Sequence, residues 1–341
     1  MKTLSILDSP LELFGLAVAH DDVFRRLPDD LYDKVNDGVT GLSWDTGGSR
    51  IRFRTDQKHI HLKAALRHGP EMGHFAFSGS SGIDCRMTIG GYNYYAGCVY
   101  PGSHGQTEIE GDFYCDDGRK ADDGMIDVTI TLPLYNGIKA LELSFDDSAK
   151  IEAPKPQKIE LPIVFYGSSI TQGGCATRPS NAYTSMIGDR LDAKYINLGF
   201  SGSARGEENI ARYIASLRKS CFVMDYDHNA PTHEHLEKTH EKFFRIIRES
   251  DPRLPIVIVT KPDYDACPAD AEKRMEICRR TYENAVKSGD KYVSFVHGQD
   301  LFEGGDRDHC TVDRCHPTDL GFWHMANVIG EAVRLAITGD R

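Results

Sequence analysis

The chain has 341 residues, of which 40% are hydrophobic and 27% charged, so it carries enough apolar material for packed cores and is not disordered throughout. Its length exceeds that of one ordinary domain and suggests two. The 40 basic and 51 acidic residues give a net charge of −11, which leaves no net positive field for a phosphate backbone, so nucleic acid is not an expected partner.

The N-terminal segment lacks the basic-then-apolar order of an export signal, because Asp8, Pro10 and Glu12 interrupt its apolar stretch. The nine cysteines are an odd, dispersed set that runs from Cys85 to Cys315. We therefore expect a cytoplasmic protein with reduced thiols. No run of 18 apolar residues occurs, so no membrane partner is expected either.

Up to residue 150 the apolar residues mostly alternate with polar ones, which is the period of half-buried strands. The clearest strands are predicted at residues 51–55, 60–64, 126–132 and 138–145. Asn136-Gly137 lies between the last two and favours a tight hairpin, so we expect those two strands to be antiparallel neighbours. With the glycine-rich turns between strands, the pattern predicts an antiparallel β-sandwich of jelly-roll type over residues 1–150.

A proline-rich connection at residues 148–162 marks the predicted boundary, and the second domain is assigned to residues 151–341. Apolar strands and helical patterns alternate in it. The strands are predicted at 163–166, 195–198, 221–224, 256–259 and 293–296, and the helices at 182–191, 207–216, 234–248, 269–288 and 320–337. This order builds a parallel sheet with helices on both faces, and its ligands bind at the carboxyl ends of the strands.

Residues suited to acyl transfer follow several of these strands. They are Gly167-Ser168-Ser169-Ile170, Gly199, Asn229, Asp313 and His316. A serine nucleophile needs a base, a carboxylate that orients the base, and donors for the oxyanion. His316 and Asp313 are candidates for the first two roles, and the N–H groups of Ser169 and Gly199 with the Asn229 amide are candidates for the third. A phosphate-binding loop is the rival interpretation of the serine turn, but no Gly-Lys-Ser/Thr follows it.

Residues 160–341 resemble the SGNH, or GDSL-type, serine esterase and lipase superfamily. The family motif G-D-S-L is matched by Gly167-Ser168-Ser169-Ile170, its glycine after the second strand by Gly199, its asparagine after the third by Asn229, and its D-x-x-H by Asp313 and His316. Two departures mark a divergent branch: Ser168 replaces the family's aspartate, and the G-x-N-D block is Asp227-His228-Asn229-Ala230. GSSITQGG, NLGFSGSARGE and DRCHPTDLGF are similar to a bacterial, carbohydrate-esterase-like branch with an N-terminal β-sandwich.

The resemblance implies a flavodoxin-like SGNH fold in which Ser169 is the nucleophile, His316 the base and Asp313 its orienting partner. The need for the nucleophile's own N–H near the oxyanion also favours Ser169 over Ser168, which would hold the loop by a hydrogen bond. Ser168, His228, Arg178 and Arg205 are further candidates for the substrate pocket. Each of the last three has an ordinary structural interpretation beside the functional one.

Two groups of metal-binding residue types are weaker candidates. The histidines at 228, 233, 235 and 240 do not have the HExxH spacing, and a metal among residues 308–316 would occupy the imidazole that acyl transfer needs. No metal or cofactor is therefore expected.

The predicted function is hydrolysis of a small acyl ester, acetyl above all, on a carbohydrate or polar metabolite. The expected partner is a small-molecule or oligosaccharide ester. An acyltransferase with the same triad, and a glycan-binding module with a vestigial triad, are the alternatives. Lysophospholipase action is a weaker one, because no amphipathic membrane helix stands out. The oligomeric state is left open.

Overall fold

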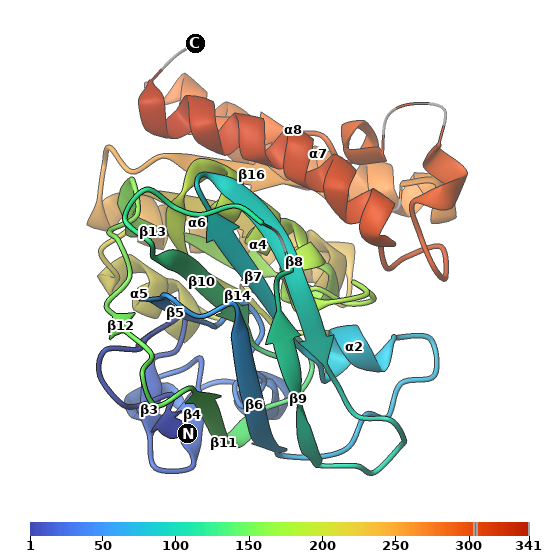
Figure 1. The fold of residues 1–341 in the computed structure, drawn as a ribbon. Helices are drawn as coiled ribbons and strands as arrows, with labels where there is room; N and C mark the ends of the chain where they lie inside the picture. The colour runs from blue at the N-terminus through green and yellow to red at the C-terminus, as the bar shows by residue number, and fades with distance from the viewer. Residues whose placement is uncertain (117, 263, 303, 305, 340–341) are drawn as a thin grey trace. The chain divides into compact units, whose positions relative to one another are not determined.

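The computed structural model describes residues 1–116, 118–262, 264–302, 304 and 306–339 (Figure 1). The chain forms two compact units. Unit 1 comprises Met1–Pro28, Ser43–Gln157 and Ala176–Ser180, and unit 2 comprises Asp29–Leu42, Lys158–Cys175 and Asn181–Arg341. Each unit thus contains short segments from the part of the sequence that mainly builds the other.

Unit 1 is built on two antiparallel sheets. One has the order β1 (Lys2–Ser5), β11 (Ile138–Phe145), β6 (His59–Leu66) and β9 (Glu108–Tyr114). The other has the order β12 (Ile151–Glu152), β5 (Arg50–Thr55), β10 (Ile126–Thr131), β7 (Ile83–Ile89) and β8 (Tyr92–Val99), with β2 (Glu12–Phe14) also paired to β5. Beside them lie the ribbon of β3 (Val18–His20) and β4 (Val23–Arg25) and the short helix α2 (Phe77–Ser80).

Alternation along the strands places one apolar face of each sheet in a shared core. Ile60, Leu62 and Ala64 of β6 are buried, while the residues between them are more exposed. Across the core, the rings of Phe53 on β5 and Phe145 on β11 meet edge to face with centroids 5.7 Å apart. The predicted β-sandwich is confirmed.

The predicted hairpin at Asn136-Gly137 is wrong, because β10 and β11 belong to different sheets. Asn136 is fully buried, and its amide nitrogen donates to the carbonyl of His68 at 2.6 Å and to Ser81 Oγ at 3.1 Å. Gly137 passes so close to Trp44 that a Cβ would lie 2.4 Å from the Trp44 carbonyl oxygen. The dipeptide therefore serves a buried crossing between the sheets, where an amide and the absence of a side chain are both required.

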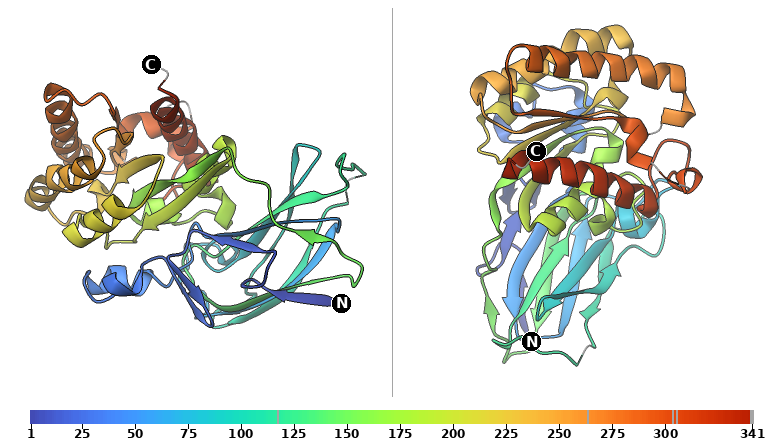
Figure 2. Two further views of the ribbon diagram at one scale, coloured as in Figure 1. Left: turned by 90° about the vertical axis from the view of Figure 1, so that its left-hand side faces the viewer. Right: turned by 90° about the horizontal axis from the view of Figure 1, so that it is seen from above.

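Unit 2 contains a five-stranded parallel sheet. Its order is β14 (Ala193–Gly199), β13 (Ile159–Gly167), β15 (Cys221–Asp225), β16 (Ile256–Val259) and β17 (Val293–Val296). The main helices are α4 (Tyr183–Leu191), α5 (Glu208–Ser216), α6 (His233–Ser250), α7 (Pro268–Lys287) and α8 (Asp319–Thr338). Helix α4 packs against α8, and α6 packs against α5 and α7, so helices cover both faces of the sheet (Figure 2).

Shorter helices occupy the connections of unit 2. They are η1 (Asp29–Leu31), α1 (Asp37–Leu42), α3 (Ser169–Gln172), η2 (Pro179–Asn181), η3 (Asp227–Asn229), η4 (Tyr264–Ala266), η5 (Gly298–Phe302) and η6 (Arg307–His309), with η2 beginning in unit 1. The strand order, with the first strand between the second and third, is that of a flavodoxin-like sheet. In the described part of the chain, no helix has both the length and the apolar character needed to cross a bilayer.

Candidate active site

The turn between β13 and α3 presents Ser169 at the carboxyl edge of the parallel sheet. Ser168 caps α3, since its Oγ accepts a hydrogen bond from the N–H of Ile170 at 3.1 Å. A Cβ on Gly167 would lie 2.1 Å from Thr171 Oγ1, so only glycine fits where the strand turns into the helix. The two neighbouring hydroxyls therefore differ: that of Ser168 holds the turn and that of Ser169 faces His316.

A chain of hydrogen bonds joins Ser169, His316 and Asp313. Ser169 Oγ lies 3.0 Å from His316 Nε2, and His316 Nδ1 lies 2.8 Å from Asp313 Oδ2. Partial burial raises the pKa of Asp313, but the hydrogen bonds that it accepts from His316 outweigh this effect and leave the pKa below its ordinary value. An ionised Asp313 accepts the proton on Nδ1 and leaves Nε2 to accept from the serine hydroxyl.

The loop of residues 311–317 holds the imidazole in place. Asp313 Oδ1 accepts from the N–H groups of Cys315 at 3.1 Å and His316 at 2.7 Å, and Arg314, between Asp313 and Cys315, has the left-handed φ of 69°. The N–H of Val312 donates to the His316 carbonyl at 2.8 Å, which closes the loop on itself. The D-x-x-H spacing thus produces a tight turn in which the carboxylate bonds both backbone and ring.

Two of the predicted oxyanion donors, Gly199 and Asn229, form hydrogen bonds within the protein. The N–H of Gly199 donates to Asn197 Oδ1 at 2.8 Å, and a Cβ on Gly199 would lie 2.2 Å from Gln172 N, so this glycine allows α3 to approach β14. The Asn229 amide donates to the carbonyl of Phe200 at 2.9 Å and so lies against the turn that follows β14. In that turn Gly202 is exposed with φ of 65°, and its N–H donates to no described residue.

A buried polar network lies beneath α3 and was not singled out by the sequence analysis. Asp225 Oδ2, at the end of β15, accepts from Thr171 Oγ1 at 2.9 Å and from the Tyr183 hydroxyl at 2.8 Å. Burial, together with the nearby charge of Asp227, raises the pKa of Asp225 to about 8, although the hydrogen bonds from Tyr183 and Thr171 lower it. The sequence signal was weak, because an aspartate that ends an apolar strand resembles the start of an ordinary loop.

The structure places the predicted pocket residues in several environments. His228, next to Asn229, is half-buried with Nε2 3.2 Å from Cys315 Sγ, so it lies against the loop that carries His316. Arg205 is exposed, and its guanidinium donates to the Gly202 carbonyl. Arg178 belongs to unit 1, where it donates to the buried Asp84 at 2.9 Å and stacks on Tyr95.

One group of metal-ligand types coincides with the triad. Ligand atoms of Asp313, Cys315 and His316 lie within 4.8 Å of one another. In the structure the imidazole of this group bonds the carboxylate through Nδ1 and the serine through Nε2, which is the arrangement that acyl transfer requires. The histidines of α6 are divided among different partners: His233 pairs with Asp270 at 2.8 Å, and the buried His240 bonds Thr281.

Both halves of the chain match models of known protein families. The model of the GDSL-like lipase/acylhydrolase family matches residues 160–334, and a model for the N-terminus of SGNH-hydrolase-type esterases matches residues 4–151. A search of curated proteins finds no significant match.

Several solved structures are similar over almost the whole chain. A candidate GDSL-like lipase of Bacteroides ovatus has 25% identity and a TM-score of 0.86, covering 99% of this chain and 98% of its own. A salicylyl-acyltransferase from a tetracycline biosynthetic pathway has 20% identity and a TM-score of 0.75, covering 99% and 97%. An acetyl xylan esterase of the rumen bacterium Butyrivibrio proteoclasticus has 11% identity and a TM-score of 0.58, covering 100% and 99%.

The last two likenesses concern the fold alone. The family match covers half of the chain and includes the segments that carry Ser169, Asp313 and His316. The chain therefore belongs to the GDSL-like lipase/acylhydrolase family and is an esterase of the SGNH type.

Proposed function

We propose that this protein removes a small acyl group, acetyl, from a hydroxyl of a carbohydrate or related polar metabolite. The observation that carries the proposal is the unbroken hydrogen-bond chain from Ser169 Oγ through His316 to Asp313. The carbohydrate and acetyl preferences are supported by the similarity in fold to the acetyl xylan esterase.

In the proposed reaction Ser169 Oγ attacks the ester carbonyl while His316 Nε2 takes the serine proton. Asp313 stabilises the imidazolium that forms. The tetrahedral intermediate collapses, and the departing alcohol receives the proton from His316. Water then attacks the acyl-enzyme with His316 as base, which releases the acid and restores Ser169.

The oxyanion of the tetrahedral intermediate needs donors beside Ser169. We assign this role to the N–H of Ser169, the second hydrogen of the Asn229 amide and the N–H of Gly202. Gly202 replaces Gly199 in the assignment, because the Gly199 N–H already has an acceptor in Asn197. The bond from Asn229 to Phe200 brings the amide to the turn that contains Gly202.

The triad is tested with Ser169→Ala and His316→Ala on p-nitrophenyl acetate. Each variant should lower kcat by several orders of magnitude, roughly 10³-fold or more, because triad members act as a unit. Labelling with a fluorophosphonate and peptide mapping should place the adduct on Ser169, whereas an adduct on Ser168 would reverse the assignment of the two serines. Near-wild-type rates in both alanine variants would end the esterase proposal.

Acyl transfer to an alcohol is the second candidate, and the similarity in fold to the salicylyl-acyltransferase favours it. The two reactions share every step up to the acyl-enzyme and differ in what attacks it. Product partition between acetate and an acetylated polyol, measured with added glycerol, distinguishes them.

A further inference from the structure

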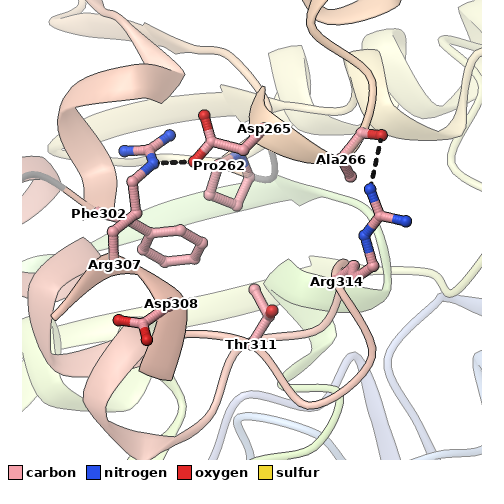
Figure 3. A pocket seen from close by; sticks show the side chains of 8 residues that line it. All are labelled: Pro262, Asp265, Ala266, Phe302, Arg307, Asp308, Thr311 and Arg314. Atoms are coloured by element: carbon pink, nitrogen blue, oxygen red, sulfur yellow. Dashed lines mark hydrogen bonds and ion pairs between the residues drawn. The ribbon is translucent and has the colours of Figure 1, made fainter.

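A pocket beside the triad loop is not used by the proposed acyl-transfer steps. It has a volume of about 480 Å³, within the roughly 300–1,000 Å³ of small-molecule sites. Figure 3 shows its eight lining residues: Pro262, Asp265, Ala266, Phe302, Arg307, Asp308, Thr311 and Arg314. All of them belong to unit 2.

The pocket lies at the carboxyl edge of the parallel sheet. Pro262 and η4 follow β16, and η5, which ends at Phe302, follows β17. The strand order in the sheet is β14, β13, β15, β16, β17. Ser169 follows β13. The pocket therefore lies at the same carboxyl edge as the serine, displaced from it towards β16 and β17.

The chemistry of the proposed reaction decides which part of the substrate lies on this side. His316 gives its proton to the oxygen of the departing alcohol, so that oxygen must lie within hydrogen-bonding distance of Nε2. The alcohol consequently extends over the loop that carries His316. Thr311 and Arg314 of that same loop line the pocket.

The lining combines mostly apolar surface with two acidic and two basic side chains, so its formal charge is balanced. Asp265 forms an ion pair with Arg307, and Arg314 Nη2 donates to the Ala266 carbonyl at 3.3 Å (Figure 3). Arg307 Nη2 is buried and has no hydrogen-bond partner among the described residues. A carboxylate accepts a hydrogen bond from a hydroxyl group, and a guanidinium donates one to a hydroxyl oxygen. Pro262 and the buried Phe302 supply an apolar part of the lining.

We infer that this pocket is the leaving-group subsite and that it holds a neutral polyhydroxylated alcohol, a sugar, whose ester oxygen faces His316. The inference rests on the proposed function and names the part of the substrate that the triad does not itself select. Arg314, which follows Asp313 in the sequence and has a left-handed backbone conformation, is a specificity-determining residue of this subsite.

Two variants alter the pocket in different ways. Arg314→Asn removes the guanidinium, and asparagine tolerates the left-handed backbone at this position. Ala266→Trp fills the pocket without a change of charge, with Ala266→Leu in its place if the tryptophan variant does not fold. The matched controls are Arg253→Asn, in the exposed loop before β16 at the opposite edge of the sheet, and Ala269→Trp, exposed at the start of α7.

The measured quantity is the ratio of kcat/KM for 6-O-acetylglucose to kcat/KM for ethyl acetate. This ratio should fall about tenfold or more in both pocket variants and by no more than about twofold in the controls. A tenfold fall corresponds to the loss of about one charge-assisted hydrogen bond. A ratio unchanged in either folded pocket variant, or an equal fall for both esters, would overturn the inference while Ser169-dependent hydrolysis persists. Absence of Ser169-dependent hydrolysis of both esters would instead overturn the proposed function and the inference with it.

Discussion

Asp225 places an ionisable group beneath the helix that carries the serine, where solvent does not reach it. With a pKa of about 8 in the folded protein, it is largely protonated and neutral at neutral pH, and Thr171 and Tyr183 hydrogen-bond to it. In the unfolded chain the same carboxyl has the ordinary pKa near 4. At this carboxyl the folded state therefore binds one more proton than the unfolded state between about pH 4 and pH 8, and the contribution of Asp225 to stability falls as the pH rises through this window.

Asp225→Asn should remove this dependence, since an asparagine oxygen accepts the same two hydrogen bonds without titrating. Between pH 5 and pH 8 the wild-type free energy of unfolding should fall by a few kcal/mol more than that of the variant, because each pKa unit corresponds to about 1.4 kcal/mol. Urea denaturation at pH 5, 6.5 and 8 measures both curves. The control is Asp300→Asn, at an exposed aspartate. If the unfolding free energies of the wild type and of Asp225→Asn changed in parallel with pH, the pKa of Asp225 would not be raised by burial.

The parallel strands of unit 2 were the most predictable elements. β16 and β17 begin and end at the predicted residues, and every residue of β16 is buried, so a short continuous apolar run was a sufficient signal. The five main helices also begin and end within two residues of the prediction, because each has a clear apolar period. Triad residues at strand ends followed from this order, and the structure brings all three together.

The prediction that was wrong was the hairpin at Asn136-Gly137, where the chain crosses between the two sheets. A dipeptide that favours hairpins also fits any place where an amide must be buried and a backbone must pass closely, and local sequence does not distinguish the two. The oxyanion glycine was ambiguous for a similar reason. Gly199 and Gly202 lie only three residues apart, and local sequence does not show that the N–H of Gly199 donates to Asn197 whereas that of Gly202 donates to no described residue.

Asn136→Ala tests the buried crossing. The change leaves the backbone carbonyl of His68 and the hydroxyl of Ser81 without their donor, so it should lower the free energy of unfolding by about 2–4 kcal/mol. An asparagine in an exposed hairpin turn would cost much less. Asn93→Ala, at an exposed position of β8, is the matched control, and chemical denaturation is the measurement. If both variants lost the same small amount of unfolding free energy, Asn136 would be no more important to stability than an asparagine in an exposed turn.

At the scale of the molecule, the chain passes between its two compact units five times, at residues 28/29, 42/43, 157/158, 175/176 and 180/181. The segment Asp29–Leu42 lies in the first part of the sequence but packs within unit 2. Its helix α1 has six residues and no apolar period, so nothing in the sequence pattern assigns it to the distant sheet. In the structure this segment is held in unit 2 by hydrogen bonds between residues about 170 positions apart in the sequence.

Asn36 is the centre of those contacts. Its side-chain nitrogen donates to the carbonyl of Ser203 at 3.0 Å and to the carboxylate of Glu207, and its Oδ1 accepts from the N–H of Val39 in the first turn of α1. Of the residues that it holds, Ser203 follows Gly202 directly and Glu207 lies five residues after it. Through Asn36, a segment near the N-terminus thus supports the turn to which we assign an oxyanion donor.

Asn36→Ala should therefore affect both stability and catalysis, although it lies more than 130 positions before Ser169. We expect a loss of about 1–3 kcal/mol in the free energy of unfolding, because the turn loses its donor and α1 loses its cap. A fall in kcat of a few fold on p-nitrophenyl acetate, with KM little changed, should accompany it, since a looser oxyanion turn weakens transition-state binding more than ground-state binding. Lys34→Ala, which removes an exposed side chain from the same segment and keeps the backbone carbonyl that Asn209 bonds, should change neither quantity. A variant with reduced stability but unaltered kcat would mean that the segment supports unit 2 without reaching the catalytic turn, and Gly202 would then lose its support as an oxyanion donor.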